Sequence, residues 1–175
     1  NQQGIEISNL NQTKLNVPGV ASLDFNQIKT PELYFGYQYA RDQLGNTEGF
    51  NPEKAVNYTT PGPNLEPNVI YLQGLWKNNP DSMELVGPEG KIMLGYSAKS
   101  INIVAGGKGE VTVKEDGKDN QANNPSKGND VDANGKLSID GQRLYNIADH
   151  TKYGNHNIEI NAKGPGFKIY TFTFG

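Results

Sequence analysis

The chain has no cysteine among its 175 residues, and this absence excludes several kinds of chemistry from it. Disulfide frameworks, thiolate metal sites, cysteine nucleophiles and paired redox cysteines all need that side chain. Histidine is nearly as scarce, because only His150 and His156 are present. Catalysis by a histidine within this chain would have to use one of these two side chains.

An excess of basic residues is also missing. Lysine and arginine number 16 against 19 aspartate and glutamate residues, which gives a formal net charge of −3 at pH 7. Nucleic-acid binding needs a basic surface, so we expect no nucleic-acid partner. No apolar run reaches the roughly 18 residues of a membrane-spanning helix, and we expect no membrane segment in this chain. The sequence begins at Asn1 without a recognisable signal peptide, so we expect it to be part of a longer protein.

Residues that favour turns are abundant. The chain contains 21 glycines and 10 prolines together with many asparagines, a composition typical of a turn-rich chain. Between these residues run short segments in which apolar and polar side chains alternate with a period of two, which indicates strands rather than helices. The segments expected as strands are 68–77, 83–86, 91–98, 100–105, 110–115, 136–139, 142–147, 157–162 and 167–174.

Several short strands at this spacing predict an all-β fold, namely an antiparallel β-sandwich of the jelly-roll type. Residues 30–175 would form the sandwich and residues 1–29 a polar lead-in arm. Two long polar segments, 41–67 and 119–135, interrupt the strands and are expected to be loops. Loops of that length within a domain are often functional.

Four parts of the sequence, taken in order, resemble the motifs of one family. The opening is TPELYFG at residues 30–36, similar to T-P-E-x-Y-x-G, and LQGLW at 72–76 is similar to L-x-G-x-W. GNDV at 128–131 resembles a G-x-D-V loop, and RLY at 143–145 with YTFTFG at 170–175 resembles an RLY and Y-x-F-T-F-G ending. Together these motifs make the chain similar to the C-terminal β-sandwich domain of DipZ-type thioredoxin-family proteins.

The resemblance implies a carbohydrate-binding-module-like sandwich that follows a thioredoxin-like domain in a bacterial, extracytoplasmic protein, either periplasmic or tethered to the membrane. Some members also carry a membrane part related to cytochrome c biogenesis proteins. The redox cysteines would lie in the upstream thioredoxin-like domain, so the resemblance implies a non-catalytic accessory domain with that domain as its partner and a carbohydrate as candidate ligand. Two alternatives stay open: a purely structural domain that packs on the thioredoxin-like domain or a protein partner, and, with least support, a glycan-acting enzyme.

Aromatic side chains are the first candidates for contact with a carbohydrate, because a sugar ring stacks its apolar face on an aromatic ring. Four tyrosines in or beside polar segments are expected to be exposed and are the candidate ligand-binding residues: Tyr37, Tyr39, Tyr58 and Tyr153. Trp76 follows the alternating apolar positions of its strand by an even number of residues. We therefore expect Trp76 to lie in the core rather than in a binding site.

The segment 130–135 reads D-V-D-A-N-G and fits the first half of a calcium-binding loop. Its oxygen-bearing side chains at alternate positions, Asp130, Asp132 and Asn134, would converge on one hard cation. The twelfth position of such a loop should be an acidic ligand, but Gly141 stands there. The competing interpretation is a turn of Asn, Asp and Gly that leads into a strand. No other cofactor is expected.

No residue is predicted to be catalytic. The G-x-S-x-G and H-E-x-x-H motifs are absent, and a Ser–His–Asp set assembled from distant positions carries little weight. The glycine-rich segment 106–109 lacks both the GK[ST] ending and the following helix of a phosphate loop, so we expect a hairpin turn there, as at 116–117. The sequence therefore predicts a chain that is not an enzyme.

Overall fold

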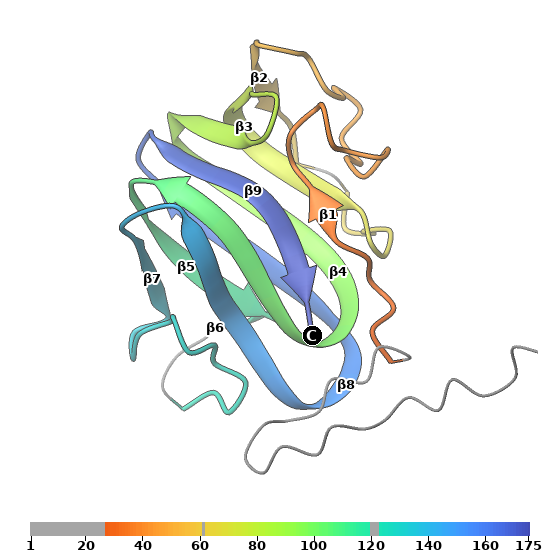
Figure 1. Ribbon diagram of the computed structural model, residues 1–175, viewed down its shortest axis with the longest axis vertical. Coiled ribbons are helices and arrows are strands. Elements are labelled where there is room, and N and C mark those ends of the chain that lie inside the picture. Colours follow the sequence, from red (N-terminus) through yellow and green to blue (C-terminus); the bar gives the residue numbers. More distant parts are fainter. Residues whose placement is uncertain (1–26, 61, 120–122) are drawn as a thin grey trace, which may run out of the picture.

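The computed structural model describes residues 27–60, 62–119 and 123–175, and the regular structure of these residues consists of strands alone (Figure 1). The strands are β1 (Leu33–Tyr34), β2 (Ala55–Tyr58), β3 (Ile70–Asn78), β4 (Met83–Gly107), β5 (Gly109–Glu115), β6 (Lys118–Asp119), β7 (Lys136–Ile139), β8 (Arg143–Lys163) and β9 (Phe167–Phe174). Every ladder that joins two of these strands is antiparallel. Within the described residues, no helix is long and apolar enough to cross a membrane. The predicted all-β, antiparallel class is confirmed.

Two long strands, β4 and β8, connect the two layers of the molecule. They pair with each other along most of their length, with a shift of register between Ala98 and Ser100 of β4. Figure 1 shows both ribbons turning back at the same end of the molecule, so that one continuous sheet folds over on itself. In one layer β1 and β9 join the later part of β4, and in the other β3 and β5 flank the earlier part of β4 and the later part of β8. The edges of this second layer are formed by β2 beside β3 and β7 beside β5.

The core lies between the two layers and is built from the inward-facing positions of the long strands. Ile92 of β4 is fully buried, as is its partner across the ladder, Ile160 of β8. Burial of each such side chain contributes about 1.5–3 kcal/mol to the free energy of unfolding. Trp76 is also fully buried, and its ring meets that of Phe167 edge-on with the centroids 6.2 Å apart. The core position predicted for Trp76 is confirmed.

The strand ends predicted inside β4 and β8 are wrong. The three strands predicted between residues 83 and 105 form the single strand β4, and the two predicted between residues 142 and 162 belong to β8. Gly87 and Pro88, where a strand was expected to end, lie in a bulge between Leu85 and Gly90, after which the ladder with β3 resumes. Hydrogen bonds from neighbouring strands carry the chain through this local turn signal.

The first predicted loop, 41–67, is not an unbroken loop, because it contains β2, which pairs with β3. In the second predicted loop, the described residues up to 135 form turns rather than strands after β6 ends at Asp119. Most of the predicted lead-in arm, residues 1–26, lies outside the described residues. The arm joins the domain at Lys29, whose amide donates to the carbonyl of Ser97 at 3.1 Å.

Of the two predicted hairpin turns, that at 116–117 is confirmed, whereas the segment 106–109 turns between two strands that do not pair with each other, so the hairpin predicted there is wrong. The turn at 106–109 joins β4 to β5, and at Gly107, with a φ of 74°, a side chain would overlap the carbonyl of Gly166. The turn between β5 and β6 has φ values of 50° at Asp116 and 76° at Gly117, both in the left-handed region that a type I′ hairpin turn requires. The second turn also fixes the position of the Asp116 carboxylate, which is part of the site described below.

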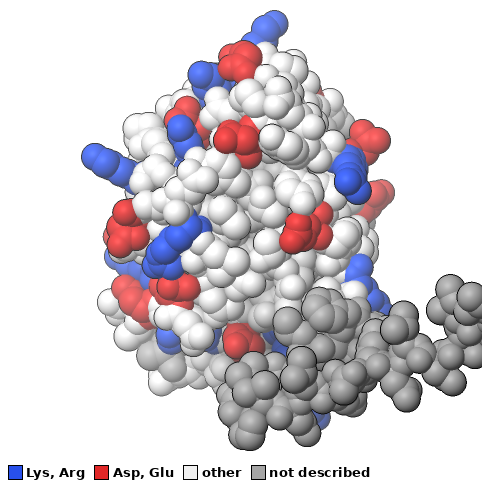
Figure 2. All heavy atoms as spheres, in the orientation of Figure 1, with Lys and Arg blue, Asp and Glu red and all other residues white. Residues whose placement is uncertain are grey.

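Charged side chains of both signs are mixed over the surface. Figure 2 shows lysine, arginine and acidic side chains interspersed on the face drawn, with a broad uncharged area near its centre. This face therefore carries no single-signed field of the kind that attracts nucleic acid or an anionic membrane.

Candidate functional site

A buried carboxylate stands at the end of β5. Val111 and Val113 point into the core on alternate positions of this strand, and Glu115 is the next residue on the same face. Only 4% of Glu115 is exposed to solvent. An ionised carboxylate in such a place needs compensating partners, because desolvation disfavours its charge.

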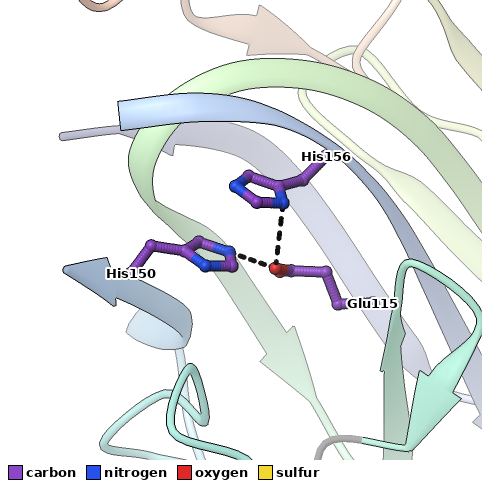
Figure 3. A group of neighbouring side chains, drawn as sticks. All are labelled: Glu115, His150 and His156. Atoms are coloured by element: carbon purple, nitrogen blue, oxygen red, sulfur yellow. Dashed lines mark ion pairs between the residues drawn. The ribbon is translucent and has the colours of Figure 1, made fainter. Parts of the chain in front are cut away.

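Two histidines of β8, His150 and His156, face this carboxylate. They lie where β8 turns from one layer to the other, and His156 occupies the same inward-facing series as Ile158 and Ile160. The two imidazole rings stack almost in parallel, with centroids 3.6 Å apart and an angle of 4° between their planes. Figure 3 shows both rings directed at the Glu115 carboxylate. We refer to Glu115, His150 and His156 as the His–Glu cluster.

The Glu115 carboxylate is the centre of this cluster. Its Oε1 atom forms an ion pair with Nε2 of His150 and lies 3.7 Å from Nδ1 of His156 (Figure 3). Its Oε2 atom accepts a hydrogen bond of 3.0 Å from the hydroxyl of Tyr96. The Nε2 atom of His150 is buried, and apart from its ion pair with Oε1 it has no hydrogen-bond partner. The carboxylate thus connects three strands, β4, β5 and β8, through polar groups inside the core.

A second carboxylate, that of Asp116, completes the surroundings of His156. The type I′ turn holds Oδ2 of Asp116 2.8 Å from Nδ1 of His156, and an ionised carboxylate can only accept, so this nitrogen donates. Oδ1 of Asp116 accepts a hydrogen bond of 2.9 Å from the backbone amide of Asn157. Both carboxylate oxygens of Asp116 are therefore held by hydrogen bonds.

The surroundings raise the pKa of Glu115 and lower those of His150 and the neighbouring Asp116. Burial raises the pKa of Glu115 to about 7, and the Tyr96 hydroxyl and His156 only partly offset this effect. Burial, reinforced by the neighbouring His156, lowers the pKa of His150. Burial also disfavours the ionised form of Asp116, but hydrogen bonds from His156 and the Asn157 amide outweigh it and lower its pKa. Perturbed acids and bases gathered in this way are typical of functional sites.

The His–Glu cluster opens onto a surface pocket of about 550 Å³. Besides the cluster, the pocket is lined by residues of the β5–β6 turn and of the segment after it, including Asp116, Lys118, Asp119, Pro125 and Ser126. Solvent and small ions can therefore reach the two histidines from outside, whereas the Glu115 side reaches into the core.

A separate polar groove of about 570 Å³ crosses the outer face of the second layer. One row of residues runs across it because the strand registers align them: Gln73 of β3 pairs with Lys91 of β4, which pairs with Asn161 of β8, which pairs with Thr112 of β5. We call these four residues the polar row. Glu159 lies beside it and is held by Lys91 at 3.1 Å and by the Asn161 amide at 3.1 Å. Although burial opposes its charge, these partners lower the pKa of Glu159 and keep it ionised.

The candidate tyrosines do not come together on one surface. Tyr58 is 1% exposed, so its expected exposure is wrong: β2, which the sequence did not predict, carries the ring into the core. The hydroxyl of Tyr37 donates to Glu53 at 2.7 Å, Tyr39 is 57% exposed, and Tyr153 lies in the turning part of β8. A role of these rings in ligand binding stays a prediction.

Two of the candidate calcium ligands already accept hydrogen bonds from the protein, Asp130 from β8 and Asp132 from its own turn. Oδ1 of Asp130 accepts a hydrogen bond from Arg143 at 3.1 Å. Oδ1 of Asp132 accepts the backbone amides of Asn134 and Lys136, at 2.8 and 3.0 Å, and these bonds lower the pKa of Asp132. Such bonding is typical of the turn that the sequence offered as the alternative. Calcium binding at Asp130, Asp132 and Asn134 stays a prediction.

Sequence reasoning missed Glu115, Asp116 and the polar row. The signal for Glu115 was present, since it continues the apolar positions Val111 and Val113 by two residues. The polar row had no comparable signal, because its members come from four strands whose registers are set by pairing across the sheet.

Comparison with known proteins shows to which family the chain that carries these candidate sites belongs. The model of a family described as thioredoxin-like C-terminal domain matches residues 30–175. The chain belongs to this family. The match spans every described strand, so the His–Glu cluster and the polar row both lie inside the thioredoxin-like C-terminal domain.

Relatives of this thioredoxin-like C-terminal domain include two mycobacterial proteins named Protein DipZ, from Mycobacterium bovis and Mycobacterium tuberculosis. Each is 30% identical over 147 residues, which is 83% of this chain but 18% of the relative. The chain therefore spans less than a fifth of the length of these relatives. The resemblance to DipZ-type proteins, inferred from short motifs, is confirmed.

The motifs that carry the resemblance occupy structural positions in this thioredoxin-like C-terminal domain. A side chain at Gly36 would overlap the backbone of Asp81, and one at Gly128 would overlap the main chain of β8. Trp76 and Tyr145 are fully buried. The motif residues that define the resemblance therefore report the fold, and the His–Glu cluster and the polar row share only Gln73 with them, at a variable position of the L-x-G-x-W motif.

Proposed function

We propose that this chain is a non-catalytic accessory domain of a bacterial, extracytoplasmic thioredoxin-like thiol–disulfide oxidoreductase, and that it binds a carbohydrate through the polar row. Membership of a family of C-terminal domains supports the accessory role, as does the much greater length of the relatives. The chain has no cysteine, so thiol–disulfide exchange would belong to another part of the protein.

The observation that carries the carbohydrate proposal is the alignment of the polar row across four strands. The amides of Gln73 and Asn161 and the hydroxyl of Thr112 both donate and accept hydrogen bonds, as sugar hydroxyls do. Lys91 supplies a charged donor, and Glu159 an ionised acceptor whose position its partners fix. A pre-organised set of donors and acceptors in a groove suits a polyhydroxylated ligand.

The composition of the groove also sets the expected strength of binding. No aromatic ring is among the described residues that line it, so the ligand would gain little from stacking. Affinity would then rest on hydrogen bonds that replace bonds to water, each with a modest net gain. We expect dissociation constants in the millimolar range.

Calorimetric titration of the 175-residue chain with a panel of soluble glycans and cell-wall fragments tests this proposal. The variant Asn161→Ala removes an amide from the row and should weaken binding about tenfold. Asn155→Ala is the matched control, because Asn155 lies on the same strand, is exposed and is outside the groove. Absence of binding by the unmodified chain at the highest glycan concentration, or equal binding by Asn161→Ala, would contradict the proposal.

A second candidate function is packing against the thioredoxin-like domain. Leu75 and Val86 both lie at the bulge between β3 and β4 and are 38% and 37% exposed, so this bulge presents two large apolar side chains to a partner. If this surface is the contact, addition of the thioredoxin-like domain should broaden the NMR signals of Leu75 and Val86 and leave those of the polar row unchanged.

A further inference from the structure

We propose that the His–Glu cluster binds one divalent transition-metal ion of the zinc class, with Asp116 as a fourth ligand. One ligand atom from each of Glu115, His150 and His156 lies within 4.8 Å of the other two. The three residues come from two strands, β5 and β8, and their positions are fixed by the core around them. The site is separate from the proposed carbohydrate groove, because no described residue lines both cavities.

The donor types favour zinc over calcium or magnesium. Two imidazoles and a carboxylate form a donor set that occurs in catalytic and exchangeable zinc sites, and Co²⁺, Ni²⁺ and Cu²⁺ accept the same donors. Calcium and magnesium instead require several oxygen ligands. The chain holds no other histidine and no cysteine, so this cluster gathers all of its nitrogen and sulfur side chains that zinc ordinarily prefers.

The polar groups of the cluster are incompletely satisfied by protein partners. Nε2 of His150 is buried and has no hydrogen bond, although it lies against Oε1 of Glu115. A buried polar atom without a hydrogen bond destabilises the folded state. A cation between this nitrogen and the carboxylate would satisfy the nitrogen lone pair and compensate the buried charge of Glu115 at once.

Coordination requires a small rearrangement that the site can accommodate. The two imidazole planes are parallel, so one ring has to turn about its Cβ–Cγ bond before both lone pairs meet at one ion. Coordination through Nδ1 of His156 also replaces the hydrogen bond from that nitrogen to Oδ2 of Asp116. Oδ1 of Asp116 remains bound to the Asn157 amide, which leaves Oδ2 in place as the fourth donor. The adjoining pocket gives the ion access from solvent.

Calorimetry of the metal-stripped 175-residue chain with ZnCl₂ tests the site. We expect one ion per chain, no response to CaCl₂ at the same concentrations, and a Co²⁺ derivative with the strong visible absorption of a four-coordinate site. His156→Ala and Glu115→Gln should each weaken zinc binding about 100-fold or more. The matched control Glu110→Gln, an exposed carboxylate on the same strand, should bind zinc as the unmodified chain does.

An NMR measurement on the unmodified chain keeps the test valid if a variant fails to fold. Zinc should shift the ring nitrogen signals of Nε2 of His150 and Nδ1 of His156, and it should leave amide signals of the polar row in place. Zinc binding that is absent from the unmodified chain, or that persists in both cluster variants, would overturn the proposal. Absence of binding would show that the two histidines and the carboxylates form only a proton-bonded cluster. Neither result bears on carbohydrate binding, whose groove has other residues.

Discussion

At the scale of single residues, the burial of Tyr58 makes the free energy of unfolding depend on pH. Burial raises the pKa of Tyr58 above its usual value of 10.0, an effect that its bond with Asn78 only partly offsets. Above pH 10 the unfolded chain releases this proton while the folded chain keeps it, so the free energy of unfolding should fall, by at most about 1.4 kcal/mol per pH unit.

The variant Tyr58→Phe should reduce that alkaline loss. It also removes the hydrogen bond of 2.8 Å to the carbonyl of Gly49, so it should cost about 1 kcal/mol near neutral pH. Urea unfolding between pH 7 and 11 would measure both effects, with the exposed Tyr39→Phe as control. An unchanged pH dependence in Tyr58→Phe would show that other groups cause the alkaline loss.

A second prediction at this scale concerns Gly36, the last residue of the motif at 30–36. A methyl group there would overlap the backbone of Asp81, which cannot move aside as a flexible side chain would. Gly36→Ala should therefore lower the free energy of unfolding by about 1–3 kcal/mol or more. Gly62→Ala, where no atom lies within 4 Å of the added carbon, should change it little. Equal thermal stability of the two variants would contradict the steric argument.

Single residues also show where sequence reasoning succeeds and fails. The alternation rule placed Trp76 correctly because its strand was predicted, and it misplaced Tyr58 because β2 was not. It gave no warning that Glu115 would meet His150 and His156, since those histidines lie in a polar stretch of β8 without a clear alternation. Only the turning of β8 between the layers brings them to the end of β5.

At the scale of elements, one buried asparagine connects the 41–67 segment to the sheet. The side-chain oxygen of Asn46 accepts the Leu72 amide at 2.7 Å, and its nitrogen donates to the Leu72 carbonyl at 2.8 Å. The side chain thus takes the place of a neighbouring strand beside β3. Long segments of this kind retain a defined conformation only when such bonds satisfy the buried backbone.

Asn46→Ala should leave both main-chain groups of Leu72 without a partner and lower the free energy of unfolding by about 1–3 kcal/mol. Hydrogen exchange is the direct measurement, because the Leu72 amide should lose protection while the amide of Ile92 keeps it relative to global stability. The exposed Asn64→Ala serves as control. Protection of Leu72 that is as strong in Asn46→Ala as in Asn64→Ala would contradict the proposed role.

The ends of the strands also depend on contacts that the local sequence does not reveal. The strand at 167–174 was predicted with its observed bounds, as was that at 136–139, since each is flanked by turn residues. The long strands β4 and β8 were divided into pieces, and in β4 the first division fell at Gly87 and Pro88, which are strong local turn signals. Pairing with β3 and with each other decides these boundaries, and such contacts are distant in sequence.

At the scale of the whole molecule, two candidate sites lie on one sandwich and depend on different features of its architecture. The polar row depends on register across four strands of the outer face, and the His–Glu cluster depends on the point where β8 passes between the layers. The family motifs maintain the core that both sites share. The sandwich fold is therefore the common scaffold, and function is assigned to each surface by its own side chains.

The most direct test of the central claim is a two-dimensional NMR titration of this chain with soluble glycans and cell-wall fragments. A glycan that binds should shift the backbone amides of Gln73, Lys91, Thr112 and Asn161, which adjoin one another across the sheet, and the side-chain amides of Gln73 and Asn161. The shifts should saturate at millimolar concentrations. Shifts confined to another surface, or none with any member of the panel, would contradict carbohydrate binding by the polar row.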